Sequence, residues 1–232
     1  MARVRMIPPE MADADLRKVY DEVRKQWGQV SNFSQVLGHQ PAALQGWMLP
    51  NDAIRLRNVK ADPDYVRIQQ LVIIKTSALN RSAYCMSHNV PLARKIGLTE
   101  EQIAATQGND YTDSRALDAK QKAPIRWAEV VTTMTAREDE AAFQAMKNHF
   151  SEQQIVELTV FCGMWNYSSR LCEALHVDLE RTDKRIEFQD RLSPQNDLHI
   201  RSPSPKFTKF PERLSSTKDG TDRIGTAFDS HV

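Results

Sequence analysis

The segment RSAYCMSHN, residues 81–89, gathers side chains that can do chemistry: serine, tyrosine, cysteine, histidine and asparagine. If residues 84–97 form one helix, Tyr84, Cys85 and His88 stand three or four positions apart and share one face. Histidine ordinarily titrates in the physiological range, which makes His88 a candidate general acid or base. The positive end of a helix dipole favours a thiolate in the first turn, which makes Cys85 a candidate reactive thiol.

Each of these residues also has a purely structural role open to it. His88 can be a hydrogen-bonded interior histidine, Cys85 a small buried hydrophobe, and Tyr84 a core residue with a satisfied hydroxyl. Cys162 and Cys172 stand among apolar helix residues and are predicted to be buried, inert thiols. The residue types alone leave the structural and the chemical interpretation open.

The composition excludes several classes of protein. The chain has 232 residues, of which 41% are hydrophobic and 26% charged, and its formal net charge is +1. These values suit one globular domain. A net charge near zero gives no overall positive electrostatic field that would attract nucleic acid or an anionic membrane. Three cysteines without a CxxC pair give no disulfide framework and no metal site. No signal peptide and no apolar run of about 18 residues is apparent, so we expect a soluble, cytoplasmic protein.

Apolar periodicity predicts that most of the chain is helical. Apolar residues recur at three and four positions from Asp13 to Trp27, and a second helical segment opens at Pro41 and is interrupted near Pro50. The stretch from Asp62 to Asn80 begins with a capping residue and a proline. Its LVII run could be a short strand, but the total length of the stretch favours a helix.

Three matches to the reciprocal capping box predict helices that start near residues 100, 136 and 152. The paired residues are Thr99 and Gln102, Thr135 and Glu138, and Ser151 and Gln154. Gly97 suits the left-handed end of the helix that carries His88. Residues 116–134 are predicted to be a further amphipathic helix, kinked or restarted at Pro124.

The composition changes after about residue 182. The remaining stretch is rich in serine, proline, lysine, aspartate and threonine and lacks apolar periodicity. Such a segment cannot offset the entropy of ordering itself. We therefore predict a helical domain over residues 1–181 and a polar C-terminal extension over 182–232, which could dock on its own or a neighbouring subunit.

Three segments of the chain carry a resemblance to known proteins: VSNFSQVLGHQPAAL, QQLVIIKTSALNRSAYCMSHNVPLARKIGLTEEQI and HFSEQQIVELTVFCGMWNYSSRLCEALHVDLE. In this order they resemble the carboxymuconolactone decarboxylase and AhpD-like alkylhydroperoxidase superfamily. The resemblance implies an all-α, AhpD-like helical bundle that assembles into homo-oligomers, as dimers, trimers or hexamers. It also implies a pocket beside the helix that carries the cysteine and the histidine.

The hydroperoxidase branch of that superfamily has a C-x-x-C pair, a histidine four positions later and a glutamate twelve positions before the first cysteine. The matching positions here are Ser82, Cys85, Asn89 and Gln70, so only Cys85 fits. A peroxidatic thiol generally needs a second thiol to resolve its sulfenic acid. With the resolving thiol, the relay carboxylate and the matching histidine all replaced, we expect a two-cysteine peroxide cycle to be disabled.

The non-redox branch includes decarboxylases of small cyclic lactone acids and other lyase-like or isomerase-like enzymes of catabolism and natural-product biosynthesis. We predict a cofactor-independent enzyme that moves a proton on a cyclic organic acid, lactone or polyketide-like substrate, with no metal. The candidate catalytic residues are His88, Cys85 and Tyr84, and the candidate substrate-binding residues are Gln70, Ser82, Asn89 and Asn166. In this prediction His88 moves the proton and Cys85 is a bystander.

Two alternatives stay open. The first is a thiol-dependent, alkylhydroperoxidase-like oxidoreductase that uses Cys85 with an external thiol. The second is a non-catalytic subunit that serves binding or assembly.

Overall fold

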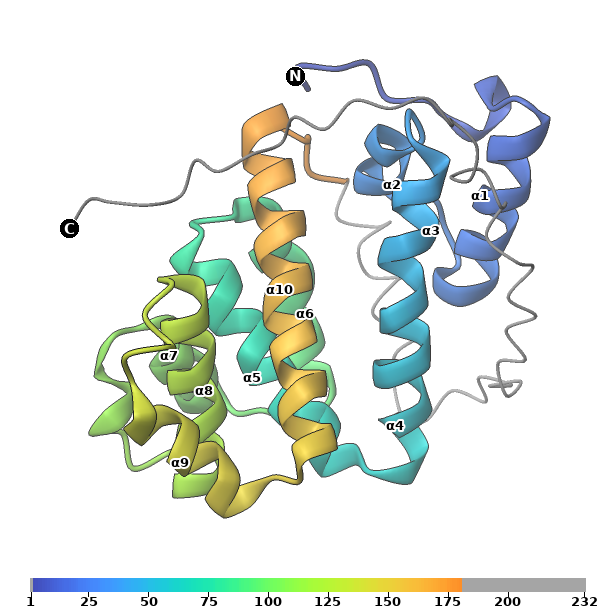
Figure 1. Ribbon diagram of the computed structural model, residues 1–232. Helices are drawn as coiled ribbons and strands as arrows, with labels where there is room; N and C mark the ends of the chain where they lie inside the picture. Colours follow the sequence, from blue (N-terminus) through green and yellow to red (C-terminus); the bar gives the residue numbers. More distant parts are fainter. Residues whose placement is uncertain (1, 181–232) are drawn as a thin grey trace, which may run out of the picture. The chain divides into compact units, whose positions relative to one another are not determined.

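The computed structural model describes residues 2–180, and within them every regular element is helical, which confirms the predicted all-α class (Figure 1). The α-helices are α1 (Ala14–Trp27), α2 (Asn32–Leu37), α3 (Pro41–Pro50), α4 (Arg57–Ala61), α5 (Pro63–Leu79), α6 (Ala83–Lys95), α7 (Glu100–Gln107), α8 (Ala119–Thr132), α9 (Glu140–His149) and α10 (Glu152–Leu175). Shorter pieces are the 3₁₀ turns η1 (Pro9–Met11) and η3 (Asp110–Thr112) and the π-helical segment η2 (Asn51–Leu56). The C-terminal extension predicted for 182–232 lies outside the described residues.

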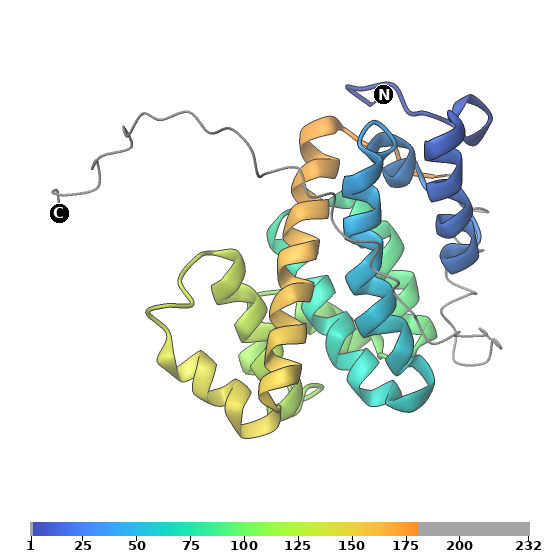
Figure 2. The ribbon, with the colours of Figure 1, turned by 45° about the vertical axis from the view of Figure 1, so that its right-hand side comes forward.

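Helix α10 packs against several of the other helices. It contacts α5, α6 and α8, and in Figures 1 and 2 helix α3 runs along its other side. The rings of Trp47 on α3 and Trp165 on α10 lie 6.1 Å apart, which joins the N-terminal helices to the rest of the bundle. No helix within the described residues has both the length and the apolar character needed to cross a bilayer.

The main core forms where α5 lies between α8 and α10. The LVII run of α5, residues 71–74, is completely buried, and it packs with residues such as Ile125, Leu158 and Phe161. A helix that is covered all round has no polar face, so its sequence is a continuous apolar run rather than a periodic one. This explains why the run could also have suggested a strand.

A second core joins the N-terminal helices to α6 and α10. Tyr20, Leu44 and Met48 pack there with Tyr84 and Cys172. Through Tyr84 this core includes part of the segment that was predicted to carry chemistry.

Two of the three predicted capping boxes are confirmed. Thr99 caps α7 and Ser151 caps α10, each with the reciprocal bond from a glutamine. Gly97 follows α6 with φ 92°, in the left-handed region that favours glycine.

The third box, Thr135 with Glu138, is wrong. The Thr135 N–H donates to Val130 O at 2.8 Å, and Met134 adopts φ 63°, so these residues close the end of α8 in a Schellman-like turn. The next helix, α9, is capped instead by Asp139, whose carboxylate accepts the Ala142 N–H at 2.9 Å. The motif is present in the sequence, but its first residue, Thr135, closes the end of α8 and does not cap α9.

Helix α8 has a capping box that the sequence prediction missed. Asp118 accepts the Gln121 N–H at 2.8 Å, and the Gln121 side chain accepts the Asp118 N–H at 3.1 Å. The helix then runs through Pro124 without restarting. The predicted restart at that proline is therefore corrected.

The predicted interruption near Pro50 is a change of helix type. Helix α3 ends at Pro50, and the chain continues as the π-helical segment η2. Proline lacks the N–H that a regular helix needs, and π-helical turns inside helices are frequent at functional sites. In this segment Asn51 and Arg55 both become buried.

Candidate active site

The first turn of α6 positions the residues singled out from the sequence. Ser82 is its N-cap and accepts the Cys85 N–H at 3.3 Å. The helix then presents Tyr84, Cys85 and His88 on one side, and all three line the same cavity. The predicted shared face is therefore present.

The cavity encloses about 570 Å³, open solvent at its mouth included, and lies among α1, α3, α6 and α10. Its walls are largely aromatic. The aromatic lining residues other than Tyr84 and His88 are Trp27, Phe33, Trp47 and Trp165. Apolar walls with a few converging polar groups are typical of small-molecule sites.

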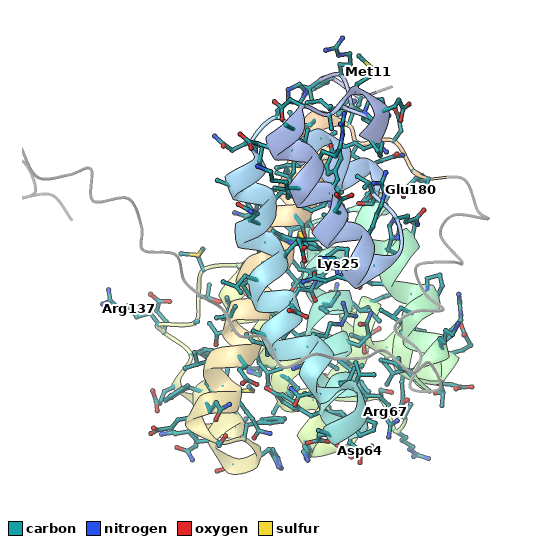
Figure 3. The ribbon with its side chains drawn as sticks, turned by 90° about the vertical axis from the view of Figure 1, so that its right-hand side faces the viewer. Met11, Lys25, Asp64, Arg67, Arg137 and Glu180 are labelled. Carbon is teal, nitrogen blue, oxygen red and sulfur yellow. The ribbon has the colours of Figure 1, made fainter. Side chains whose placement is uncertain are left out.

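His88 is paired with a carboxylate. Its Nε2 lies 2.6 Å from Glu180 Oε2, and both residues are buried, with 8% and 7% of their surface exposed. Figure 3 labels Glu180 on the segment that follows α10, at the end of the described chain. The Ala2 N–H donates to Asp178 at 3.0 Å, which ties this segment to the N-terminus, and the Arg3 N–H donates to Leu175 O, at the end of α10, at 2.8 Å.

The surroundings of Glu180 decide which partner holds the proton. Burial alone would raise the pKa of its carboxyl group, but hydrogen bonds from His88, Tyr84 and the Asn32 N–H outweigh burial and lower it. The group is therefore an ionised acceptor at neutral pH. It follows that His88 Nε2 carries a hydrogen and donates it to Glu180.

Tyr84 supports this carboxylate. Burial, and then the charge of Glu180, raises the pKa of the Tyr84 phenol well above its usual range, so the hydroxyl stays protonated and donates to Glu180. Its oxygen also accepts the Phe33 N–H at 3.2 Å. Tyr84 thus positions Glu180, in addition to lining the cavity.

Cys85 lies in a nest of donors. The Cys172 thiol donates a hydrogen bond to the Cys85 sulfur, and although burial opposes it, this bond together with serine hydroxyls lowers the pKa of Cys85 to about 6. Ser168 Oγ lies 3.9 Å from the sulfur, and Ser169 has no other hydrogen bond within residues 2–180. The thiolate is therefore the main form of Cys85 at neutral pH.

Cys162 and Cys172 differ, although both are on α10 and both were predicted to be inert. Cys162 is completely buried, contacts the hydroxyls of Thr76 and Thr132 at 3.4 Å each, and does not line the cavity. Its predicted structural role fits this location. Cys172 lines the cavity beside Cys85, which the sequence pattern did not indicate.

Arg55 is a cavity residue that the sequence prediction missed. It is only 3% exposed, it donates to Gln70 Oε1, and its guanidinium lies 5.5 Å from the centre of the Trp165 ring. Burial lowers the pKa of Arg55 to about 10, which leaves it cationic at neutral pH. No carboxylate of the described part of the chain forms an ion pair with it. The cavity therefore carries a positive charge that an anion can neutralise.

Of the predicted substrate-binding residues, Asn89 lines the cavity, whereas Gln70 and Ser82 lie behind its wall. Asn89 donates to Cys85 O at 2.8 Å, within α6. Gln70 is completely buried and donates to Asn89 O at 2.8 Å, so it joins Arg55 to α6 instead of facing a substrate.

Asn166, the fourth predicted substrate-binding residue, also does not line the cavity. Its side chain donates to Thr132 Oγ1 at 3.0 Å and accepts from Asn80 at 2.8 Å. These bonds join α10 to α8 and to the end of α5. Asn166 is therefore placed as a link between helices, on a different side of α10 from Trp165.

The described residues contain no group of three histidine, cysteine, aspartate or glutamate side chains that could hold a metal ion.

The sequence model described as "Carboxymuconolactone decarboxylase family" matches residues 66–119, which include most of α5 and all of α6 and α7. Over this stretch the chain is similar to the carboxymuconolactone decarboxylase family. The resemblance predicted from the sequence is thereby confirmed. The match contains the helix with Cys85 and His88, whereas Arg55, Cys172 and Glu180 lie outside it.

Similar proteins support the same fold. YdfG of Bacillus subtilis strain 168, which is uncharacterized, is 24% identical over 108 residues, or 46% of this chain and 72% of that protein. The AhpD core of a peroxidase-related protein from Ralstonia eutropha JMP134 superposes with a TM-score of 0.64 at 19% identity, covering 80% of this chain and 95% of that one. The debrominase Bmp8 in complex with 2,3,4-tribromopyrrole superposes with a TM-score of 0.61 at 15% identity, covering 82% and 100%.

Proposed function

We propose that the chain is a cofactor-independent enzyme of the decarboxylase, lyase or isomerase type that moves a proton on a small cyclic organic acid, lactone or polyketide-like ring. One observation carries the proposal: His88 lines the cavity while its Nε2 is held by the ionised Glu180 at 2.6 Å. A histidine oriented by a carboxylate is a common arrangement for general acid–base catalysis.

The pair divides the work between its two members. Glu180 fixes the orientation of the imidazole through Nε2, and its negative charge stabilises the cationic ring that forms when His88 accepts a proton. The imidazole exchanges that proton with a carbon of the bound substrate. Tyr84 and the Asn32 N–H hold Glu180 in place throughout.

The lining of the cavity supports an anionic, ring-shaped substrate. Arg55 offers a buried positive charge for a carboxylate or for the developing enolate. Trp47 and Trp165 offer flat apolar surfaces for a ring. The complex of the debrominase Bmp8 with a tribrominated pyrrole supports a planar ring as a guest of this fold.

The proposal is tested by deuterium incorporation. A panel of cyclic lactone acids and aromatic acids is incubated with the protein in heavy water, and exchange at carbon is followed by NMR. We expect exchange with the wild type, a loss of roughly 10²- to 10⁴-fold in His88→Ala, and substantial exchange in Cys85→Ser. His149→Ala on α9 is the matched control, because His149 does not line the cavity.

The roles are wrongly assigned if Cys85→Ser abolishes exchange and His88→Ala does not. Binding of panel members without exchange or conversion would instead indicate a binding subunit.

A second function is favoured by the state of Cys85. A thiolate that lines a cavity at neutral pH suits a thiol-dependent, alkylhydroperoxidase-like oxidoreductase. Consumption of a hydroperoxide, with a sulfenic-acid trap found on Cys85, would support this function. Unlabelled Cys85 after such treatment would exclude it.

The homo-oligomer and the cytoplasmic location remain predictions. Sedimentation of the full-length protein measures the first, and imaging of the tagged protein in its own cell tests the second.

A further inference from the structure

One wall of the cavity carries three polar side chains at intervals of four residues. Trp47 is in α3, and Asn51 and Arg55 are in the π-helical segment η2 that continues it. Residues four positions apart are neighbours on a helix, and all three of these line the cavity. An anion at the Arg55 guanidinium leaves the polar atoms of Trp47 and Asn51 without a role.

The indole Nε1 of Trp47 is a buried donor that has no acceptor within residues 2–180. Edge contacts with Trp27 and Phe33, at ring-centre distances of 4.7 and 4.9 Å, hold the ring in place. A buried donor without an acceptor is costly, and native proteins contain few of them. A ligand in the cavity can supply the missing acceptor.

The side-chain amide of Asn51 also lacks a partner. Asn51 is only 4% exposed, and its amide forms no hydrogen bond with any other residue in the described part of the chain. Asn89 lines the same cavity, but its amide is satisfied, because it donates to Cys85 O and accepts from Gln70. An amide both donates and accepts, so Asn51 offers a ligand both kinds of hydrogen bond.

Trp165 connects the two ends of this wall. Its ring centre lies 6.1 Å from that of Trp47 and 5.5 Å from the guanidinium carbon of Arg55. Both groups therefore border the same indole. A single six-membered ring with two polar substituents can contact both of them together.

We infer that Trp47, Asn51 and Arg55 form one subsite for a ring acid that also carries a hydroxyl group. The carboxylate binds Arg55, and the hydroxyl oxygen accepts the Trp47 Nε1–H while its hydrogen is donated to Asn51 Oδ1. An ether or carbonyl oxygen only accepts, and it would leave that amide oxygen unpaired. The inference rests on the proposed function and narrows its substrate class to hydroxylated ring acids.

The experiment measures binding of benzoate, 3-hydroxybenzoate and 3-methoxybenzoate to the full-length protein by calorimetric titration. Meta isomers are used because an ortho hydroxyl would bond to its own carboxylate. One additional neutral hydrogen bond predicts that the wild type binds 3-hydroxybenzoate roughly 3- to 10-fold more tightly than benzoate. We expect 3-methoxybenzoate to bind no more tightly than benzoate.

Two variants locate the hydroxyl. Asn51→Leu should remove the preference for 3-hydroxybenzoate and change benzoate binding little, and Trp47→Phe, which keeps a ring but loses the N–H, should reduce the preference. Two substitutions away from the cavity are the matched controls and should keep it. They are Trp127→Phe, whose indole donates to Thr159 at 2.8 Å, and Asn148→Leu on the exposed side of α9.

Equal binding of 3-hydroxybenzoate and benzoate by the wild type, or binding of neither, would overturn the inference. A preference that persists in both Asn51→Leu and Trp47→Phe would also overturn it. If Asn51→Leu does not fold, the wild type and Trp47→Phe decide the result. Because the readout is affinity and not exchange at carbon, hydroxyl-selective binding without exchange contradicts only the proposed function, and exchange without hydroxyl selectivity contradicts only this inference.

Discussion

The carboxylate of Glu180 accepts a hydrogen bond from His88 Nε2 at 2.6 Å, although the two residues are 92 positions apart in the chain. Through this contact the segment after α10 closes over the first turns of α6 and supplies the charged partner of the imidazole. The same carboxylate accepts from Tyr84 and from the Asn32 N–H. One side chain therefore stabilises the packing of three segments. It also determines that His88 Nε2 and the Tyr84 hydroxyl keep their hydrogens.

Replacing Glu180 is expected to destabilise the protein. Glu180→Ala leaves the donors of His88, Tyr84 and Asn32 buried without this acceptor, which should lower the free energy of unfolding by about 3 kcal/mol. Urea denaturation at neutral pH measures it. Glu100→Ala is the control, because Glu100 forms an exposed pair with Arg94 and should change stability little. Equal effects of the two substitutions would refute the structural role of Glu180.

The acid side of the stability curve should also depend on Glu180. Its pKa is lower in the folded protein than the ordinary value of 4.5, so the unfolded chain binds more protons as the pH falls. The stabilisation is therefore complete above that ordinary value and is lost as the pH falls through the folded value. We expect Glu180→Gln to flatten the part of the curve below that ordinary value in denaturation experiments. An unchanged acid limb would show that the carboxylate is not paired.

The thiolate of Cys85 can be titrated directly. Its ultraviolet absorbance should appear with a midpoint at about pH 6, compared with the ordinary value of 9.0. Cys172→Ala removes the strongest donor to the sulfur and should raise this midpoint, whereas Cys162→Ala should not change it. A wild-type midpoint near the ordinary value would contradict the donor nest described for Cys85.

Arg55 should determine binding of anions. Benzoate serves as the probe, and its neutral analogue benzamide as the reference ligand, in calorimetric titrations. Loss of a hydrogen bond to a charged group costs about 1.5–3 kcal/mol, so Arg55→Gln should weaken benzoate binding roughly 10- to 100-fold. Benzamide binding should change little. If both ligands weaken equally, Arg55 supports the shape of the cavity and not its charge selectivity.

Features with a local cause could be predicted from the sequence. The shared face of Tyr84, Cys85 and His88 follows from helix periodicity, and the caps at Thr99 and Ser151 need only residues three positions apart. Thr135 shows the limit of such local signals, because its N–H bonds to Val130 O at the end of α8 and the residue does not cap the next helix.

The rest of the site depends on contacts between distant segments. Glu180 follows α10 in a stretch without regular structure, and Arg55 lies in a π-helical segment that breaks the usual period. Cys172 lines the same cavity as Cys85 because α10 packs against α6. The apolar periodicity of a sequence carries no information about contacts between distant segments. The same limit applies to Asn166, which is on the same helix as Trp165 but does not line the cavity.

The most direct test of the account is a double-mutant cycle on proton exchange. The rate of deuterium incorporation into the most responsive acid of the panel is measured for the wild type, His88→Ala, Glu180→Gln and the double variant. If the two residues act as a unit, each single variant loses exchange and the double variant is no slower than His88→Ala alone. Wild-type exchange by His88→Ala, or a double variant that shows the product of the two separate losses, would contradict it.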